Sequence, residues 1–366
     1  MSARYWGVEK KETPDTGHED MQNVLTDIVI PHFNGLKVLK TCVSSLRRQS
    51  ESRFQIIVVD NGSTDESPAW LRQQADIKSI FLAENSGFAA AVNLGIRQGS
   101  APFIFLLNND TELEEKTLAR LLATAEKRVE FVFFAPKMLS YHYRSILDGA
   151  GDAYLRGGAG YRLGTMEPDS EQYNRPGPVF GGCAGATLYR RSLFDRVGLF
   201  DEDFFAYCED VDLNLRLNRA GLKGYYVPEA RVYHVGSATS GSKINAFTVE
   251  LSTRNSLYLL AKQYPLALVV RLLPVIAIYQ FFWMLFCVKK KQLPAYLRGM
   301  RGALGNLRGM RRKYRQLRHL DQVRLEEFSD CLRKAEREAV DSIIRRCENE
   351  GKNSRLLHLY TWLFLT

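Results

Sequence analysis

Short apolar runs alternate with amphipathic stretches over the first 140 residues of the chain. A run that is apolar throughout is typical of a parallel strand buried on both faces, and apolar residues at every third or fourth position are typical of a helix. Strands and helices in alternation favour a parallel sheet, because parallel strands need a crossover connection. The sequence therefore predicts an α/β fold with a mainly parallel sheet flanked by helices. The expected strands are residues 27–30, 54–59, 79–82, 103–107 and 131–134, and the expected helices are residues 36–46, 67–74, 87–98 and 111–128.

The alternation stops after residue 140. Residues 140–178 are rich in Gly, Tyr and Arg and keep no sustained period. A long irregular segment inside a compact domain is usually functional, so we expect a loop beside a site here. Regular structure is expected again as a strand at 179–189, a helix at 209–220 and short strands at 223–227 and 231–235.

The last hundred residues are predicted to be helical and to associate with a membrane. Residues 266–288 form an apolar stretch that is long enough to cross a bilayer, but Arg271, Pro274 and Gln280 interrupt it. We therefore favour a helical hairpin that lies in the membrane plane or is partly inserted, over a spanning helix. The expected organisation is a polar N-terminal leader at 1–23, an α/β domain at 24–260 and a helical, basic, membrane-associating region at 261–366.

The composition is that of a globular protein with reduced cysteines. Of the 366 residues, 45% are hydrophobic and 25% are charged, as in an ordinary globular protein. The six cysteines are scattered without a CxxC pair, which favours reduced thiols over a disulfide framework or a metal site. Residues 1–23 contain no apolar segment, so we expect no secretory signal there.

The net charge of +9 comes from one segment. Residues 289–318 contain eleven Lys or Arg and no Asp or Glu, so the rest of the chain is slightly acidic. Because the run directly follows the apolar stretch, it favours an anionic membrane surface as the partner. No nucleic-acid-binding motif accompanies it, so we expect no nucleic acid partner. An alternative stays open, in which residues 266–288 are a core or dimer helix and the basic run is a solvated face; a homodimer stays open with it.

Polar motifs follow four of the expected strands. They read PHFNG from Pro31, DNGSTD from Asp60, ENSGFAAAVNLG from Glu84 and NND from Asn108. Since the carboxyl ends of parallel strands meet at one edge of the sheet, the four motifs can line one crevice. Asp60 is a suitable acceptor for the N3–H of a uracil or thymine ring, and the small residues after Gly87 let a helix N-terminus approach a pyrophosphate. Asp110 is a hard oxygen ligand for Mg²⁺ or Mn²⁺, although a turn with a helix cap would explain the triplet equally well.

Six segments in order resemble family 2 glycosyltransferases. They are IVIPHFNG, VVDNGSTD, ENSGFAAAVNLGI, FLLNND, GGCAGATLYRRSLFDRVGLFDEDFFAYCEDVDLNLRL and VYHVGS. The resemblance covers residues 24–260 and implies the GT-A fold, a Rossmann-like α/β fold that binds nucleotide-diphosphate sugars. Within the family, the chain looks most like the rhamnosyltransferase-type enzymes of bacterial polysaccharide synthesis.

The resemblance also implies roles for single residues. The base-binding aspartate of the family falls on Asp60, and its metal-binding Asp-x-Asp motif falls on residues 108–110, where Asn replaces the first Asp and leaves Asp110 as the ligand. The catalytic Glu-Asp motif falls on Glu209 and Asp210, with Asp210 as the base, and a late metal-contacting histidine falls on His234. The implied donor-binding residues are Pro31, Asn34, Asp60, Asn61, Gly62, Asn85, Gly87, Phe88, Asn93, Asn109 and Arg254.

Structural explanations remain for several of these residues. Acidic first turns of helices are common, a single histidine is more often a half-buried structural residue than a ligand, and Arg254 fits a surface helix. Phe204, Phe205 and Tyr207 suit either a core or a platform for a sugar ring.

The function implied by the resemblance is an inverting, metal-dependent sugar transfer. The best match is rhamnose from dTDP-rhamnose, with a UDP-hexose or UDP-galactofuranose donor as the alternative. The implied acceptor is a lipid-linked saccharide or polysaccharide, the cofactor is Mg²⁺ or Mn²⁺, and the implied location is the cytoplasmic face of the inner membrane. A non-catalytic subunit that binds nucleotide sugars or glycans is the alternative of another class, but the presence of both Asp110 and Asp210 disfavours it. A nicotinamide dehydrogenase is excluded because no GxGxxG follows the first strand.

Overall fold

Residues 26–107 form a parallel sheet. A computed structural model describes residues 24–236 and 244–366, so the expected leader at 1–23 lies outside the described residues. Strands β3, β2, β1 and β4 lie side by side and run parallel, as predicted. The elements in chain order are β1 (Thr26–His32), α1 (Leu36–Arg47), β2 (Phe54–Asp60), α2 (Ser67–Leu71), β3 (Ile77–Phe81), α3 (Phe88–Gln98) and β4 (Phe103–Leu107).

The second half of the sheet is mixed. Strand β11 (Ala186–Arg190) lies antiparallel to both β4 and β6 (Phe131–Ser140), because no α-helix separates β6 from β11 along the chain. Strand β12 (Lys223–His234) runs parallel to β6, and β10 (Gly177–Val179) pairs with its outer edge. The complete order is β10-β12-β6-β11-β4-β1-β2-β3. The predicted α/β class is confirmed: β3, β2, β1 and β4 form an all-parallel half, and the other half combines the parallel pair of β6 and β12 with antiparallel strands.

One predicted helix begins later than its spacing indicates. The helix expected at 111–128 is α4 (Thr117–Lys127), because Thr111–Leu113 form strand β5 and pair with Val232–His234 of β12. The prediction was wrong there because a short half-buried strand and a first helical turn can share the same apolar spacing. The residue before β5, Asp110, therefore stands between two strands.

The segment predicted to be irregular contains short strands. Residues 140–178 include β7 (Leu147–Gly149) and the hairpin of β8 (Asp152–Leu155) with β9 (Ala159–Arg162). The strand expected at 179–189 is confined to β11. The two strands expected at 223–227 and 231–235 are one strand, β12, with a register shift around Pro228.

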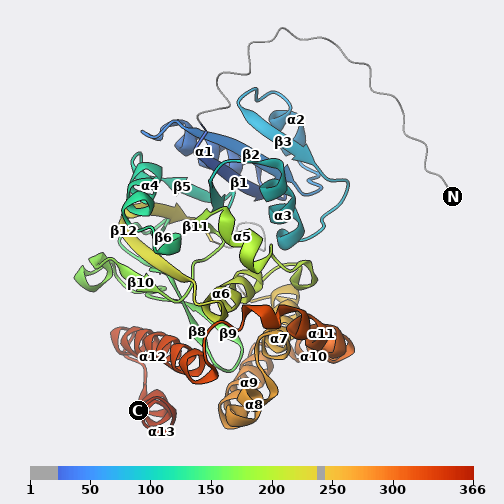
Figure 1. Cartoon of the computed structure of the whole chain (residues 1–366), viewed down its shortest axis with the longest axis vertical. Helices are drawn as coiled ribbons and strands as arrows, with labels where there is room; N and C mark the ends of the chain where they lie inside the picture. The colour runs from blue at the N-terminus through green and yellow to red at the C-terminus, as the bar shows by residue number, and fades with distance from the viewer. Residues whose placement is uncertain (1–23, 237–243) are drawn as a thin grey trace, which may run out of the picture.

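Apolar layers cover both faces of the sheet. Ile28 and Ile30 of β1 pack with α1 and α4 on one face, while Val29 between them packs with α3, α5 (Ser192–Val197) and α6 (Glu209–Arg219) on the other. This alternation follows from the two-residue period of a strand. Helices therefore lie on both faces of the sheet, and Figure 1 shows α1, α2 and α3 around the parallel strands β1, β2 and β3.

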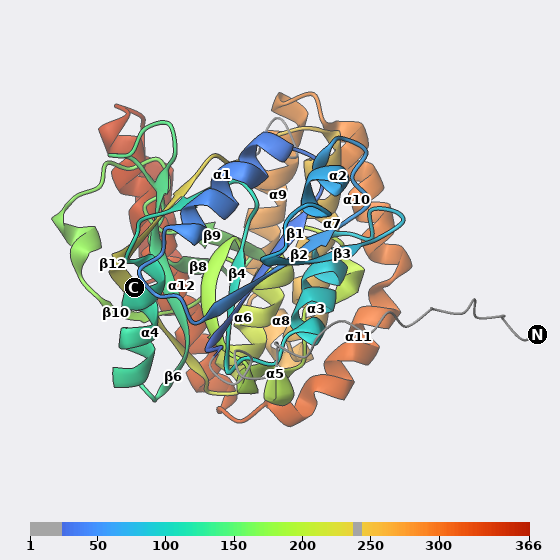
Figure 2. The same cartoon turned by 90° about the horizontal axis from the view of Figure 1, so that it is seen from above.

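The remaining residues form a helical region. The orange helices α10 and α11 lie on one side of the molecule and the red helix α12 on the other, in both views (Figures 1 and 2). The apolar stretch at 266–288 is two helices that meet at Leu272. None of the helices in the described ranges has both the length and the apolar character needed to cross a membrane. The helices are α7 (Ala246–Gln263), α8 (Leu266–Arg271), α9 (Leu273–Lys289), α10 (Leu293–Gly305), α11 (Leu307–Gln316), α12 (Leu325–Asn349) and α13 (Arg355–Phe364).

Candidate active site

A cavity of about 1000 Å³ opens at the carboxyl ends of β1 and β4. The polar motifs after these strands form one wall, and the β8–β9 hairpin forms another. The beginnings of α6 and α7 complete it, so segments from across the sequence meet here. Of the residues predicted to act, the lining includes Pro31, Asn61, Asn85, Phe88, Asn109, Asp110, Glu209, Asp210 and His234.

Asp110 and His234 lie in contact, as the metal prediction requires. The pairing of β5 with β12 brings them together, and the His234 Nε2 lies 3.2 Å from the Asp110 Oδ1. The His234 Nδ1 lies 2.8 Å from the Oδ2 of Asp148 on β7. Burial lowers the pKa of His234, but the hydrogen bonds with Asp110 and Asp148 outweigh it and raise the pKa to about 9. The carboxylates of Asp110 and Asp148, of which Asp148 also pairs with Arg162, therefore stabilise a positive charge at His234, whose Nε2 must release its proton before it can bind a metal ion.

The contact between Asp110 and His234 fits a divalent metal. Neighbouring ligands of an octahedral Mg²⁺, each about 2.1 Å from the ion, are about 3.0 Å apart. The 3.2 Å between the Asp110 carboxylate and the His234 imidazole is close to this spacing. Asp148 would then orient the imidazole from behind. Sequence reasoning missed Asp148, because it lies in the segment without a period and belongs to no recognised motif.

Glu209 and Asp210 open helix α6 and also line the cavity. The Asp210 Oδ2 accepts a hydrogen bond from the Ala184 N–H at 3.3 Å, and its Oδ1 accepts one from the Val211 N–H at 2.8 Å. Burial raises the pKa of Asp210, although these two amides and Arg162 oppose the shift. The pKa of Glu209 is raised well above its usual range by burial and by Asp210. Asp210 thus combines access to the cavity with a carboxylate that accepts a proton more readily than an exposed aspartate.

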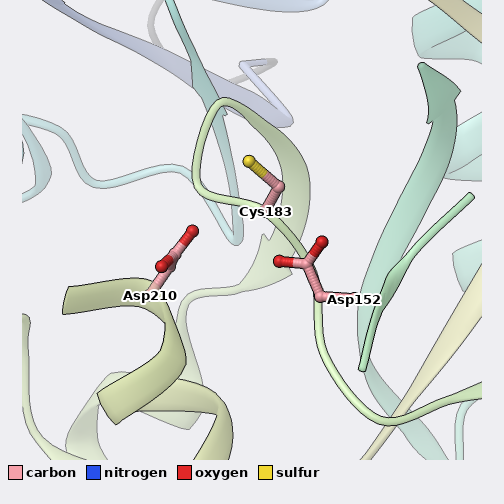
Figure 3. Close-up of side chains that lie close together, drawn as sticks. All are labelled: Asp152, Cys183 and Asp210. Carbon is pink, nitrogen blue, oxygen red and sulfur yellow. The ribbon is translucent and has the colours of Figure 1, made fainter. Parts of the chain in front are cut away.

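A buried acidic cluster surrounds Asp210. Figure 3 shows Asp152 from the start of β8 and Cys183 from the loop before β11 next to Asp210, and their potential ligand atoms lie within 4.8 Å of one another. Burial, and then the charge of Asp210, raise the pKa of Asp152 to about 8. Burial also raises the pKa of the Cys183 thiol, and the guanidinium of Arg162 already supplies positive charge here. Because a metal needs the thiolate, the cluster suits a shared proton better than a second metal ion.

The second and third polar motifs interlock beside the cavity. The Asn61 Nδ2 donates to the Asn85 Oδ1 at 3.0 Å and to the Gly87 carbonyl at 3.1 Å. Gly62 has a φ of +78°, and a Cβ there would lie 2.6 Å from the backbone of Glu84, so only glycine permits this approach. The two motifs therefore act as one rigid corner.

Asp60 and His32 each keep one unsatisfied buried atom at this corner. The Asp60 Oδ2 accepts a bond from the Ser63 N–H at 3.3 Å, while its Oδ1 has no hydrogen-bond partner in the described part of the chain. The His32 Nδ1 lies 2.7 Å from the Asn109 Nδ2, and the His32 Nε2 likewise has no partner among the described residues. Burial lowers the pKa of His32. Buried polar atoms are rarely left unpaired, so this corner suits a polar ligand.

Six of the predicted donor-binding residues do not line the cavity: Asn34, Asp60, Gly62, Gly87, Asn93 and Arg254. The Asn93 amide binds the Phe200 backbone and Glu202. The Arg254 guanidinium binds the carbonyls of Asp203 and Phe204. Asn93 on α3 and Arg254 on α7 face other parts of the protein, and the spacing of the motifs does not show which way a helical side chain points. Asn34, Asp60, Gly62 and Gly87 stand behind the lining residues, and the Asn34 side chain fixes the loop at Thr64.

The aromatic residues before α6 divide between core and cavity. Phe204 is buried, whereas Phe205 and Tyr207 line the cavity beside Phe247 of α7. Phe205 and Tyr207 adopt positive φ of 63° and 66°, which is strained for bulky residues. The buried Asn255 holds this loop, because its Nδ2 lies 3.0, 2.9 and 2.7 Å from the carbonyls of residues 204, 206 and 207. Such strain held by a side chain is common at functional sites.

Known proteins resemble this chain in sequence and fold. The model of the family described as "Glycosyl transferase family 2" matches residues 27–198. An N-acetylglucosaminyl-diphospho-decaprenol L-rhamnosyltransferase of Mycobacterium tuberculosis is 30% identical over 254 residues, a match to 60% of this chain and 79% of that protein. The O-antigen biosynthesis protein RfbC of Myxococcus xanthus is 29% identical over 224 residues, 58% of this chain and 17% of RfbC. The crystal structure of GalNAc-T7 with UDP, GalNAc and Mn²⁺ superposes with a TM-score of 0.51 at 16% identity, over 73% of this chain and 57% of that chain, a likeness of fold alone.

Proposed function

The chain belongs to glycosyl transferase family 2, and from this premise we propose that it transfers a sugar from a nucleoside-diphosphate donor with inversion at the anomeric carbon. The observation that carries the proposal is one cavity shared by the contact of Asp110 with His234 and by Asp210. Sugar transfer requires a site for a cation, which Asp110 and His234 would form, and a base, for which the Asp210 carboxylate with its raised pKa is suited.

The donor nucleotide is proposed to bind at the corner made by the second and third polar motifs. The unpaired Asp60 Oδ1 would accept the N3–H of a uracil or thymine ring. Asn61, Asn85 and Phe88 line the cavity next to it and would contact the ribose and the diphosphate. Our first choice of donor is dTDP-rhamnose, since the matched relative of Mycobacterium tuberculosis is an L-rhamnosyltransferase. A UDP-hexose or UDP-galactofuranose is the alternative.

A divalent metal ion is proposed to be held by Asp110 and His234. When bound, Mg²⁺ or Mn²⁺ would stabilise the negative charge of the departing diphosphate. Support comes from the 3.2 Å contact of the two side chains and from the Mn²⁺ in the crystal structure of GalNAc-T7. Asp148 would keep the imidazole of His234 in its orientation.

Asp210 is proposed to act as the general base. The acceptor hydroxyl oxygen bonds to the anomeric carbon and its proton passes to the Asp210 carboxylate. The bond from that carbon to the diphosphate oxygen breaks, and its electron pair leaves with the diphosphate. The transition state resembles an oxocarbenium ion, so the nearby carboxylates also stabilise it electrostatically. Arg162 and Asp152 would tune the proton affinity of Asp210 through their charges.

The acceptor is proposed to be a lipid-linked saccharide at the cytoplasmic face of a membrane. This choice rests on the diphospho-decaprenol acceptor in the name of the matched relative. Phe205, Tyr207 and Phe247 at the cavity wall would provide apolar surfaces for the acceptor sugar ring.

The test is a screen of the purified full-length chain against dTDP-rhamnose, UDP-galactofuranose and several UDP-hexoses. Release of nucleoside diphosphate is measured with Mg²⁺ or Mn²⁺ present and with a lipid-diphosphate-N-acetylglucosamine acceptor. We expect one donor to stand out and its turnover to rise when the acceptor is added. Release from none of the donors, with binding of none by calorimetry, would contradict the proposal.

A further inference from the structure

Helix α9 exposes an apolar face that no described part of the chain covers. Val270, Leu273, Phe281, Leu285 and Val288 recur along α8 and α9 at helical spacing, and each is between 43% and 65% exposed. No charged residue occurs between Leu272 and Val288. Single exposed apolar residues are ordinary on a protein surface, but a continuous apolar helix face marks an interaction site.

The opposite face of α9 is fastened to the enzyme. The Gln280 Nε2 donates to the Gly157 carbonyl at 3.0 Å and to the Ser256 Oγ at 2.9 Å, and the Trp283 Nε1 donates to the Thr253 Oγ1 at 2.8 Å. Helix α9 is therefore bound along its length to α7 and to the β8–β9 turn. Only its outer apolar face is open to a partner.

Helix α13 presents a second apolar face next to the same turn. Leu356, Leu359, Trp362 and Leu363 are between 51% and 70% exposed. The Arg156 Nη2 donates to the Phe364 carbonyl at 3.0 Å, and the next residue, Gly157, accepts the bond from Gln280 of α9. One β-turn thus holds both helices, and Figure 1 shows α8, α9 and α13 together at the end of the molecule opposite α1 and α2.

The charge along α8 to α11 is positive, whereas His358 of α13 lies 3.7 Å from Glu348 of α12. Residues 251–320 contain no Asp or Glu, and neither does α13. Part of the basic run already has partners within the chain. Arg298 forms an exposed pair with Glu250, and Lys313 pairs with Asp201 and Asp203. Arg311 donates to the backbone carbonyls of Ala261 and Tyr264. By contrast, Lys289, Lys290 and Lys291 directly follow the apolar face, are exposed and form no ion pair with any described residue.

We propose that α9 and α13 form one docking surface for an anionic lipid bilayer, with their exposed apolar side chains in the headgroup region and Lys289–Lys291 on the anionic lipids. Apolar burial and charge then act together, which is the combination that holds a protein stably on a membrane. Charge complementarity selects the bilayer over a second copy of this chain. A symmetric contact through α9, in either relative orientation of the two helices, would place each lysine triplet against α8 or α9 of the other copy, which carry no acidic group to offset it.

The surface is connected to the cavity by the β8–β9 hairpin. Gly160, Tyr161 and Arg162 of the hairpin line the cavity, while its turn carries both apolar helices. Docking would therefore bring the cavity wall close to the bilayer. This is where the lipid-linked acceptor of the proposed function would be found, although the docking surface itself does not depend on that function.

The experiment is co-sedimentation of the full-length chain with vesicles, without donor or acceptor. Vesicles of phosphatidylcholine with phosphatidylglycerol are compared with vesicles of phosphatidylcholine alone, at low and at high salt. We expect binding to the anionic vesicles that weakens with salt. Each lysine near an anionic surface strengthens adsorption about fivefold, so the triple variant Lys289→Gln, Lys290→Gln, Lys291→Gln should lower the partition coefficient about a hundredfold.

Two apolar variants test the helices separately. Phe281→Ser with Leu285→Ser, and Trp362→Ser with Leu363→Ser, should each lower the partition coefficient at least about tenfold. The matched controls are Lys37→Gln, Lys116→Gln and Lys127→Gln for charge, and Val129→Ser with Tyr143→Ser for exposed apolar groups, all outside α8–α13. The controls should bind vesicles like the unchanged chain. Thermal unfolding followed by circular dichroism checks the folding of every variant, and we expect the melting temperature of the unchanged chain in each.

Three results would overturn the proposal. They are no binding to anionic vesicles at low salt, α9 and α13 variants that bind like the unchanged chain, and control variants that lose binding equally. A dimer in analytical ultracentrifugation that the α9 variant dissociates, without vesicle binding, would assign the face to a second copy instead. Failure of the proposed function would appear differently, as absence of nucleoside diphosphate release with vesicle binding intact.

Discussion

Asp212 lies two residues after the proposed base, and we predict that it acts on stability and not on chemistry. Residues two apart on a helix point in nearly opposite directions, so Asp210 faces the cavity while Asp212 faces the interior. Asp212 is fully buried and accepts bonds from the Arg216 Nε at 3.0 Å, the Lys262 Nζ at 2.8 Å and the Gln263 Nε2 at 2.7 Å. It thereby ties α6 to α7, the two helices whose beginnings form the cavity wall.

The expected cost of Asp212→Asn follows from these partners. Removing one member of a buried ion pair typically destabilises a protein by about 3–5 kcal/mol, because the other charge stays buried without compensation. Here Lys262 keeps the Asp201 Oδ2 at 2.7 Å, and Arg216 keeps the Gly198 carbonyl at 2.9 Å. We therefore expect the lower limit, about 3 kcal/mol, and a melting temperature lower by roughly 4 °C.

The assay is thermal and urea unfolding followed by circular dichroism, together with kcat measured well below the melting temperature. Asp212→Asn should unfold earlier and keep kcat within a few-fold. Asp210→Asn is the matched control on the same helix. It should keep the melting temperature, since it removes a carboxylate that burial already disfavours. A stable Asp212→Asn protein that has lost kcat by orders of magnitude would refute the reasoning and move the catalytic role to Asp212.

Three further variants test other parts of the site. Asp110→Ala should weaken Mn²⁺ binding at least about tenfold by calorimetry and abolish metal-dependent turnover, and unchanged Mn²⁺ affinity would remove Asp110 from the metal site. Asp60→Ala should weaken binding of the nucleoside diphosphate about 10- to 100-fold, because a hydrogen bond to a charged group is lost. Its kcat should change little, because this bond lies far from the reacting carbon. Equal affinity of the variant and the unchanged chain by calorimetry would contradict this prediction. Asp152→Asn should flatten the dependence of stability on pH. The folded-state pKa of Asp152 is raised to about 8 by burial and by Asp210, so its stabilising contribution is complete below the ordinary aspartate pKa and is lost as pH rises through about 8. The unchanged chain should therefore melt at a lower temperature at about pH 9 than at about pH 5, more so than the variant, and identical pH profiles would exclude Asp152 as the titrating group.

The strand ends of the parallel half could be predicted from the sequence because they combine two local signals. Each apolar run is followed directly by its polar motif, so Asp60, Asn61 and Asp110 had to reach the same edge of the sheet. The contact of His234 with Asp110 needed the resemblance, because it depends on the pairing of β5 with β12. The sequence pattern did not predict that pairing, because the apolar spacing of Thr111–Leu113 fits a helix equally well.

The other half of the site depends on contacts between distant segments. Residues 140–178 supply Asp148, Asp152 and Arg162, but no hydrophobic period predicts a strand there. These side chains affect the pKa values of the cavity carboxylates only when the β8–β9 hairpin packs beside α6. Asn93 and Arg254 lie outside the cavity lining for a related reason, since tertiary packing decides which helix face meets the cavity. The sequence predicted that the whole basic run forms one surface, yet Lys313 forms an ion pair with Asp201, more than a hundred residues earlier in the chain. The division into domains at residue 260 stays a prediction.

The central claim is that Asp210 is the base of a sugar transfer in this cavity. The most direct measurement compares Asp210→Asn with the unchanged chain in nucleoside diphosphate release, with donor and metal binding measured on the same samples by calorimetry. The account predicts binding nearly intact and kcat lower by about 10²–10⁴, because the amide keeps the shape of the carboxylate but cannot take the hydroxyl proton. A near-normal kcat in Asp210→Asn, with Glu209→Gln inactive under the same conditions, would contradict it.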